Sequence, residues 1–202
     1  MVTAPPRRLP LPAILLALWA LCLVLLPFRI GTIYSGLPAH PLFLHVPVIF
    51  IPLTGLAALV AAVRPRFLER YGVALAVVTI ATLAGTILTA DAGSALRREL
   101  RGGGGFGGAG FGPGGGEASL IARHASAGHT LEYLTIVFAL AVIGSVVLLR
   151  RREGAALRIV SALLGIACIF FVVKTGDLGA KAVWNGRLGG NNPSQGTGFG
   201  SP

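Results

Sequence analysis

The chain has 202 residues, of which 54% are hydrophobic and 12% are charged, and its formal net charge is +10. Soluble domains carry about 25% charged residues, so this chain, with a mean hydropathy of +0.79, can cover its surface only with lipid. The composition therefore excludes a soluble enzyme. The basic residues fall in short clusters between apolar runs, where positive charge sets membrane orientation rather than binding nucleic acid.

Five apolar runs are long enough to cross a bilayer as helices, which takes about 20 residues each. The first run, 11–28, resembles a secretory signal, but its apolar stretch is long for one and no clear cleavage site follows it. We therefore expect an uncleaved anchor helix there. The remaining runs are 42–63, 71–90, 129–149 and 156–173. These runs predict an all-α, polytopic membrane protein with five transmembrane helices.

The predicted organisation has three parts. An N-terminal tip and anchor helix occupy 1–36, a four-helix membrane module occupies 37–190, and a flexible tail occupies 191–202. We find no internal sequence repeat.

Arginine positions predict the orientation of the spans. Basic residues concentrate before the first span and in the second and fourth connections, and such clusters favour the cytoplasmic side. The N-terminus is therefore expected to be cytoplasmic and the C-terminus external. The arginines concerned are Arg7, Arg8, Arg64, Arg66, Arg70, Arg150, Arg151, Arg152 and Arg158.

The third connection, 92–128, is rich in glycine and is predicted to be a flexible external loop, or one that a partner orders. A phosphate-binding interpretation fails, because no strand precedes the glycines and no Gly-Lys-Ser/Thr ending follows them.

All four histidines are external in this topology, and they form two pairs with the same spacing. His40 and His45 flank the start of the second span, and His124 and His129 flank the start of the fourth. Both spans run inward, so they are parallel, and the inner histidine of each pair lies about 7.5 Å deeper than the outer one. We therefore expect His45 and His129 to meet at a shared depth.

Further polar residues are expected at the same face. Ionisable side chains at membrane depth are costly and usually line a bundle interior. Glu132, one turn from His129, is a candidate to orient that imidazole by a hydrogen bond. The full set is Asp91 after the third span, Glu132 and Tyr133 in the fourth, and Lys174, Asp177 and Lys181 after the fifth.

Facing histidines on neighbouring helices are the usual way in which a helical bundle holds haem iron. We predict one haem b with His45 and His129 as axial ligands and His40 and His124 near its propionates. Copper or zinc on the imidazoles is the alternative. Without any cofactor, His40 would cap a helix, His124 would be solvated, and the deeper pair would be satisfied by hydrogen bonds.

Around such a haem, Glu132 and Asp91 are predicted to orient imidazoles or contact propionates. Lys174 and Lys181 are predicted to pair with propionates by charge-assisted hydrogen bonds. No combination of nucleophile and base indicates an enzyme that acts alone.

The segment from His40 to Pro47 resembles the opening of a small bacterial membrane family catalogued as domain of unknown function 2231. Three further segments fall in the family's order, and the resemblance covers about 37–190. Val46, Ala180 and the residues after Val183 depart from the family's usual pattern. The further segments are Thr89-Ala90-Asp91, His129 and Gly176 to Trp184.

This resemblance implies a multi-pass protein of the bacterial inner membrane. Relatives joined to Rieske-type or cytochrome-like modules imply a redox setting. The leading hypothesis is therefore a redox subunit that relays electrons between a periplasmic cytochrome or iron-sulfur protein and a membrane complex. The rival hypothesis is a cofactor-free accessory subunit whose glycine-rich loop and tail wrap other subunits of a larger complex.

Overall fold

The computed structural model describes residues 11–25, 33–34, 37–101 and 115–184. Apart from one short β-hairpin and the turns at 64 and 148–151, the described residues are helical, which confirms the predicted all-α class. The hairpin pairs Ile33 with Pro38 and Tyr34 with Leu37. In chain order, the elements are α1 (Leu11–Leu25), β1 (Ile33–Tyr34), β2 (Leu37–Pro38), α2 (Ala39–Val63), α3 (Pro65–Arg101), α4 (Gly115–Val147) and α5 (Arg152–Trp184).

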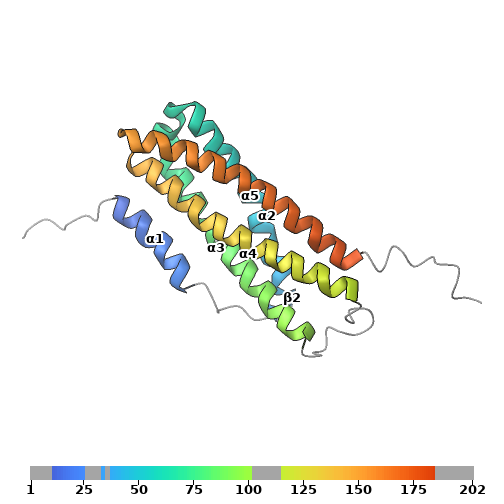
Figure 1. Cartoon of the computed structure of the whole chain (residues 1–202). Helices are drawn as coiled ribbons and strands as arrows, with labels where there is room; N and C mark the ends of the chain where they lie inside the picture. The colour runs from blue at the N-terminus through green and yellow to red at the C-terminus, as the bar shows by residue number, and fades with distance from the viewer. Residues whose placement is uncertain (1–10, 26–32, 35–36, 102–114, 185–202) are drawn as a thin grey trace, which may run out of the picture.

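Four long helices, α2 to α5, form the body of the molecule as two helical hairpins (Figure 1). Within the hairpins α2 packs on α3 and α4 packs on α5, and between them α2 contacts α5 and α3 contacts α4. All four are long and apolar enough to cross a membrane. Large apolar side chains such as Leu53, Leu163 and Phe170 are exposed on the outer faces, as a bilayer environment requires.

The N-terminal helix α1 lies along α3 and α4 (Figure 1). It is shorter than the four spans, and the end of the predicted 11–28 run lies outside the described residues. Leu15 is buried in the main core, and Trp19 Nε1–H donates a hydrogen bond to the Ile136 carbonyl at 3.2 Å. The helix is therefore attached to the bundle by specific contacts.

The predicted external loop 92–128 is mostly helix, which corrects that prediction. α3 continues to Arg101 and α4 begins at Gly115, so only 102–114 and the tail from 185 lie outside the described residues. Hydropathy detects only the part of a helix inside the bilayer, whereas residues 94–101 are mainly good helix formers such as Ala, Leu, Arg and Glu.

Small and hydroxylated residues allow the helices to approach closely, as is typical of membrane bundles. A Cβ placed at Gly55 of α2 would lie 3.0 Å from the Gly165 carbonyl oxygen of α5. Buried threonine hydroxyls donate hydrogen bonds to the backbone carbonyl four residues earlier. For example, the Thr79 hydroxyl donates to the Leu75 carbonyl at 2.7 Å. This packing fixes how each helix is rotated, and so which polar residues face inward.

Candidate functional site

His40 is held between α2 and α3. It stands in the first turn of α2, where the following Pro41 is well tolerated. Its Nδ1–H donates to the Thr89 carbonyl of α3 at 2.9 Å. The ring lies directly against Gly93, where an added Cβ would be 2.9 Å from Nδ1. Glycine is therefore required at position 93 because the His40 ring fills the space that a Cβ would occupy, and not because of the backbone conformation.

His124 is held in the same way between α4 and α5. Its Nδ1–H donates to the Thr175 carbonyl at 2.9 Å. The ring lies against Gly179, where an added Cβ would be 3.0 Å from Cε1 and 3.1 Å from Nδ1. Each helical hairpin thus fixes one imidazole through the same two contacts.

The two imidazoles meet across the boundary between the hairpins. Their ring centroids are 6.0 Å apart, and the ring planes are at 87°. The contact places the starts of α2 and α4 at the same end of the bundle, which confirms that these spans are parallel. The contact therefore brings one imidazole from each of these two spans together.

The pair that meets is the outer one, however, and not His45 and His129 as the sequence predicted. Both inner histidines are exposed, and the His45 Nδ1–H donates to the Leu42 carbonyl of its own helix at 3.3 Å. A step of five residues turns a helical side chain by roughly 140°. When His40 and His124 face inward, the inner pair is therefore turned away.

The predicted partner of His129 is in place. Its Nδ1–H donates to Glu132 Oε2 at 3.3 Å, and the two side chains are 46% and 22% exposed. The hydrogen bond between these residues is confirmed, but it lies on the outer surface of α4. Tyr133 beside it is 67% exposed.

The remaining predicted residues lie near the same end on α3 and α5. Asp91 is half-buried two residues after Thr89. Asp177 and Lys181 form an exposed ion pair at 2.7 Å along α5. Lys174 is exposed, with Nζ 5.3 Å from the centre of the Phe171 ring. Both lysines have partners on their own helix.

The hydrogen bonds determine which nitrogen of each imidazole is free. A carbonyl oxygen only accepts, so Nδ1 carries the proton in both His40 and His124. In the neutral ring, Nε2 then has an unshared electron pair. Binding Nδ1–H to a backbone carbonyl is how proteins orient histidines that ligate metals through Nε2.

The two threonines behind these histidines differ in one respect. The Thr89 hydroxyl donates to the Gly85 carbonyl at 2.7 Å. The Thr175 hydroxyl is buried with no hydrogen-bond partner among the residues that the structure describes, and the residue is only 8% exposed. An unpaired buried hydroxyl costs free energy, so a polar group bound beside His124 would satisfy it.

The two hairpins repeat one short sequence pattern, which corrects the expectation that the chain has no internal repeat. The threonine that binds the histidine is followed by an aspartate two residues later and by the contacting glycine four residues later. The pattern is Thr89-Ala90-Asp91-Ala92-Gly93 on α3 and Thr175-Gly176-Asp177-Leu178-Gly179 on α5.

The spacing along each hairpin also repeats. Thr89 follows Arg64 by 25 residues, and Thr175 follows Arg150 by 25 residues. Each half begins with two histidines five residues apart. The first histidine precedes the arginine in the turn by 24 residues in one half (His40 to Arg64) and by 26 in the other (His124 to Arg150). The site therefore consists of two halves with the same sequence pattern and the same histidine contacts.

Comparison with known proteins identifies one family. Residues 36–192 match the model of a family described as a predicted membrane protein (DUF2231). No curated protein and no solved structure matches the chain.

Proposed function

We propose, from the premise that the chain belongs to the DUF2231 family of predicted membrane proteins, that it is a membrane redox subunit that binds one haem b through His40 and His124. The observation that carries the proposal is the meeting of two imidazoles, each oriented by a hydrogen bond from Nδ1–H to a carbonyl, which leaves Nε2 as the nitrogen that can bind a metal. The outer histidines thus replace the inner pair as the proposed axial ligands.

The two rings lie near each other across the boundary between the hairpins. The centroids of the His40 and His124 rings are 6.0 Å apart, so the two residues would be the ones to hold the iron of a bound haem. When bound, haem supplies one-electron chemistry whose potential depends on its axial ligands and its burial.

The number of ligands favours haem over a bare ion. Zinc sites use three or four protein ligands. In the part of the chain that the structure describes, no group of three His, Cys, Asp or Glu is placed to hold a metal. Haem iron needs only two axial ligands from the protein, and His40 and His124 provide two.

The position of the histidines supports exchange with an external partner. His40 and His124 lie about 36 and 39 Å along their helices from Arg64 and Arg150. Such a separation exceeds the roughly 30 Å hydrocarbon core. If the arginine turns face the cytoplasm, the imidazoles lie at the periplasmic boundary, within reach of a soluble cytochrome or iron-sulfur protein.

Side chains near the histidines have defined tasks in this proposal. The Thr175 hydroxyl, buried without a partner, would donate a hydrogen bond to a polar group of the ligand. Gly93 and Gly179 allow the two imidazoles to pack directly against α3 and α5. Lys174 and Lys181 are exposed at the same end and are the candidates to neutralise propionates.

A difference spectrum of the purified full chain tests the proposal. We expect a reduced-minus-oxidised band of b-type haem after expression with excess haem precursor. His40→Ala and His124→Ala should each lose the low-spin spectrum, because each removes one axial ligand. His45→Ala and His129→Ala are the matched controls and should keep it, because their rings lie on the outer surface.

Two results would contradict the proposal. One is a folded, haem-supplied sample with no haem band. The other is a band that survives loss of His40 and His124 together but disappears in the control variants. In the first case the outer pair serves only to join the hairpins, and the accessory-subunit hypothesis is the better one.

A further inference from the structure

The turn between α2 and α3 forms a small cavity at the end of the bundle opposite the histidines. Arg64 is the only residue between the two helices, and Pro65 begins α3, a position that suits proline. Arg64 N–H donates to the Val60 carbonyl at 2.8 Å, and Phe67 N–H to the Arg64 carbonyl at 2.9 Å. These bonds hold the turn in a defined shape.

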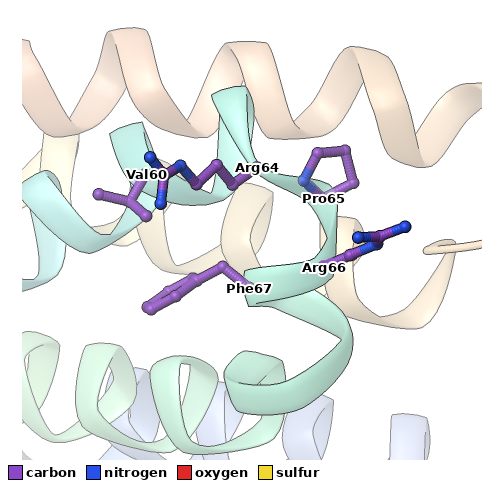
Figure 2. A pocket seen from close by; sticks show the side chains of 5 residues that line it. All are labelled: Val60, Arg64, Pro65, Arg66 and Phe67. Carbon is purple, nitrogen blue, oxygen red and sulfur yellow. The ribbon is translucent and has the colours of Figure 1, made fainter.

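The cavity has a volume of about 670 Å³ and combines positive and apolar walls. Figure 2 shows the Arg64 side chain folded back toward Val60, with Phe67 on the opposite side, while Arg66 extends away on the other side of the turn. This volume lies within the usual range for sites that bind small molecules, about 300–1,000 Å³.

The positive charge at this turn is not neutralised within the described part of the chain. Arg64, Arg66 and Arg70 are exposed and form no ion pair there, and neither does the nearby Glu69. Arginine binds phosphate through parallel N–H donors, with geometry that lysine does not provide. An anion of phosphate type would therefore suit this turn.

Apolar and aromatic side chains next to these arginines indicate a ligand with a hydrocarbon part. Val60 and Val63 are 38% and 71% exposed on the last turns of α2. The Phe67 and Tyr71 rings pack with centroids 5.2 Å apart at the start of α3. Aromatic residues at the ends of membrane spans mark the level of the lipid headgroups.

From this arrangement we propose that the α2–α3 turn is a binding site for an anionic phospholipid. Arg64 binds the headgroup phosphate and Arg66 adds positive charge on the other side of the turn, Phe67 and Val60 line the glycerol region, and an acyl chain lies along the exposed apolar face of α2. Basic pockets at the ends of membrane helices bind anionic lipids in this way. The proposal does not depend on haem binding.

Lipid retention by the detergent-purified full chain tests the site. The protein is exchanged into micelles containing phosphatidylglycerol or phosphatidylcholine, and bound lipid is measured by native mass spectrometry. The test variant is Arg64→Gln/Arg66→Gln. The control is Arg151→Gln/Arg152→Gln, which removes the same charge from exposed positions at the same end of the bundle.

We expect the wild type and the control to retain phosphatidylglycerol in preference to phosphatidylcholine. The test variant should retain at least about tenfold less phosphatidylglycerol than the wild type. Equal loss in both variants would overturn the proposal in favour of general surface charge, and no loss in either would also overturn it. Displacement of the lipid by millimolar inorganic phosphate would show that soluble phosphate is the ligand. A thermal unfolding curve confirms that the test variant is folded.

Discussion

The contact between His40 and Gly93 predicts that Gly93→Ala destabilises the protein although alanine is the better helix former. A methyl group at 93 would lie 2.9 Å from Nδ1 and 3.0 Å from Cε1 of the ring. The ring is fixed by its hydrogen bond to Thr89, so it moves only at the expense of that bond. Inserting a methyl into a filled space costs about 1–3 kcal/mol.

Gly176→Ala is the matched control, because Gly176 lies in α5 beside Thr175 and no atom would come within 4 Å of its Cβ. Replacing glycine by alanine inside a helix stabilises by about 0.5–1 kcal/mol. This gain applies to both variants, so Gly93→Ala should be less stable than Gly176→Ala by about 1–3 kcal/mol. For a chain of this size, each kcal/mol changes Tm by about 2–4 °C.

Thermal unfolding of the full chain in a mild detergent measures this difference. The same glycine variant is then made in a His40→Ala background, where the ring is gone and the added methyl has room. There Gly93→Ala should become neutral or stabilising, which isolates the contact as a coupling between the two residues. Equal Tm values for Gly93→Ala and Gly176→Ala, or the same effect of Gly93→Ala in both backgrounds, would refute the reasoning.

Three further predictions concern packing away from the histidines. A Cβ at Gly85 would overlap Val46, so Gly85→Ala should lower the free energy of unfolding by about 1–3 kcal/mol, and a second change, Val46→Ala, should restore part of the loss on thermal unfolding. Trp19→Phe removes the hydrogen bond to the Ile136 carbonyl, so α1 should become more sensitive to limited proteolysis, with a loss of about 0.5–1.5 kcal/mol. Phe138 is fully buried, so Phe138→Ala should cost about 3–5 kcal/mol in denaturant unfolding, and a loss below 1 kcal/mol would contradict the packing described for the core.

Hydropathy predicted the four long spans, because a span needs a run of residues that transfer favourably into lipid. The clusters of arginine marked the connections between α2 and α3 and between α4 and α5. Hydropathy could not place the helix ends near Arg101 and Gly115, since helix outside the bilayer has no apolar signature. The same limitation produced the predicted loop at 92–128.

The sequence also predicted that the histidines share one end of the bundle but could not select the pair that meets. That selection depends on the rotation of α2 and α4 about their axes, which is set by close contacts such as Gly55 with Gly165. The sequence did contain a usable signal, because the repeated Thr-x-Asp-x-Gly pattern identifies the two carbonyls that bind His40 and His124. The pattern alone does not separate the outer from the inner histidines, because both pairs recur at the same spacing in the two halves.

The division of contacts between the hairpins has a consequence for how the protein is assembled during synthesis. The bonds that orient His40 and His124 each lie within one hairpin, whereas the contact between the rings crosses from one hairpin to the other, as does the packing of α2 on α5 and of α3 on α4. The first hairpin can therefore enter the bilayer with its imidazole already oriented, before the second has left the ribosome. Completing the centre then requires only the lateral docking of two preformed units, and not a search by individual side chains.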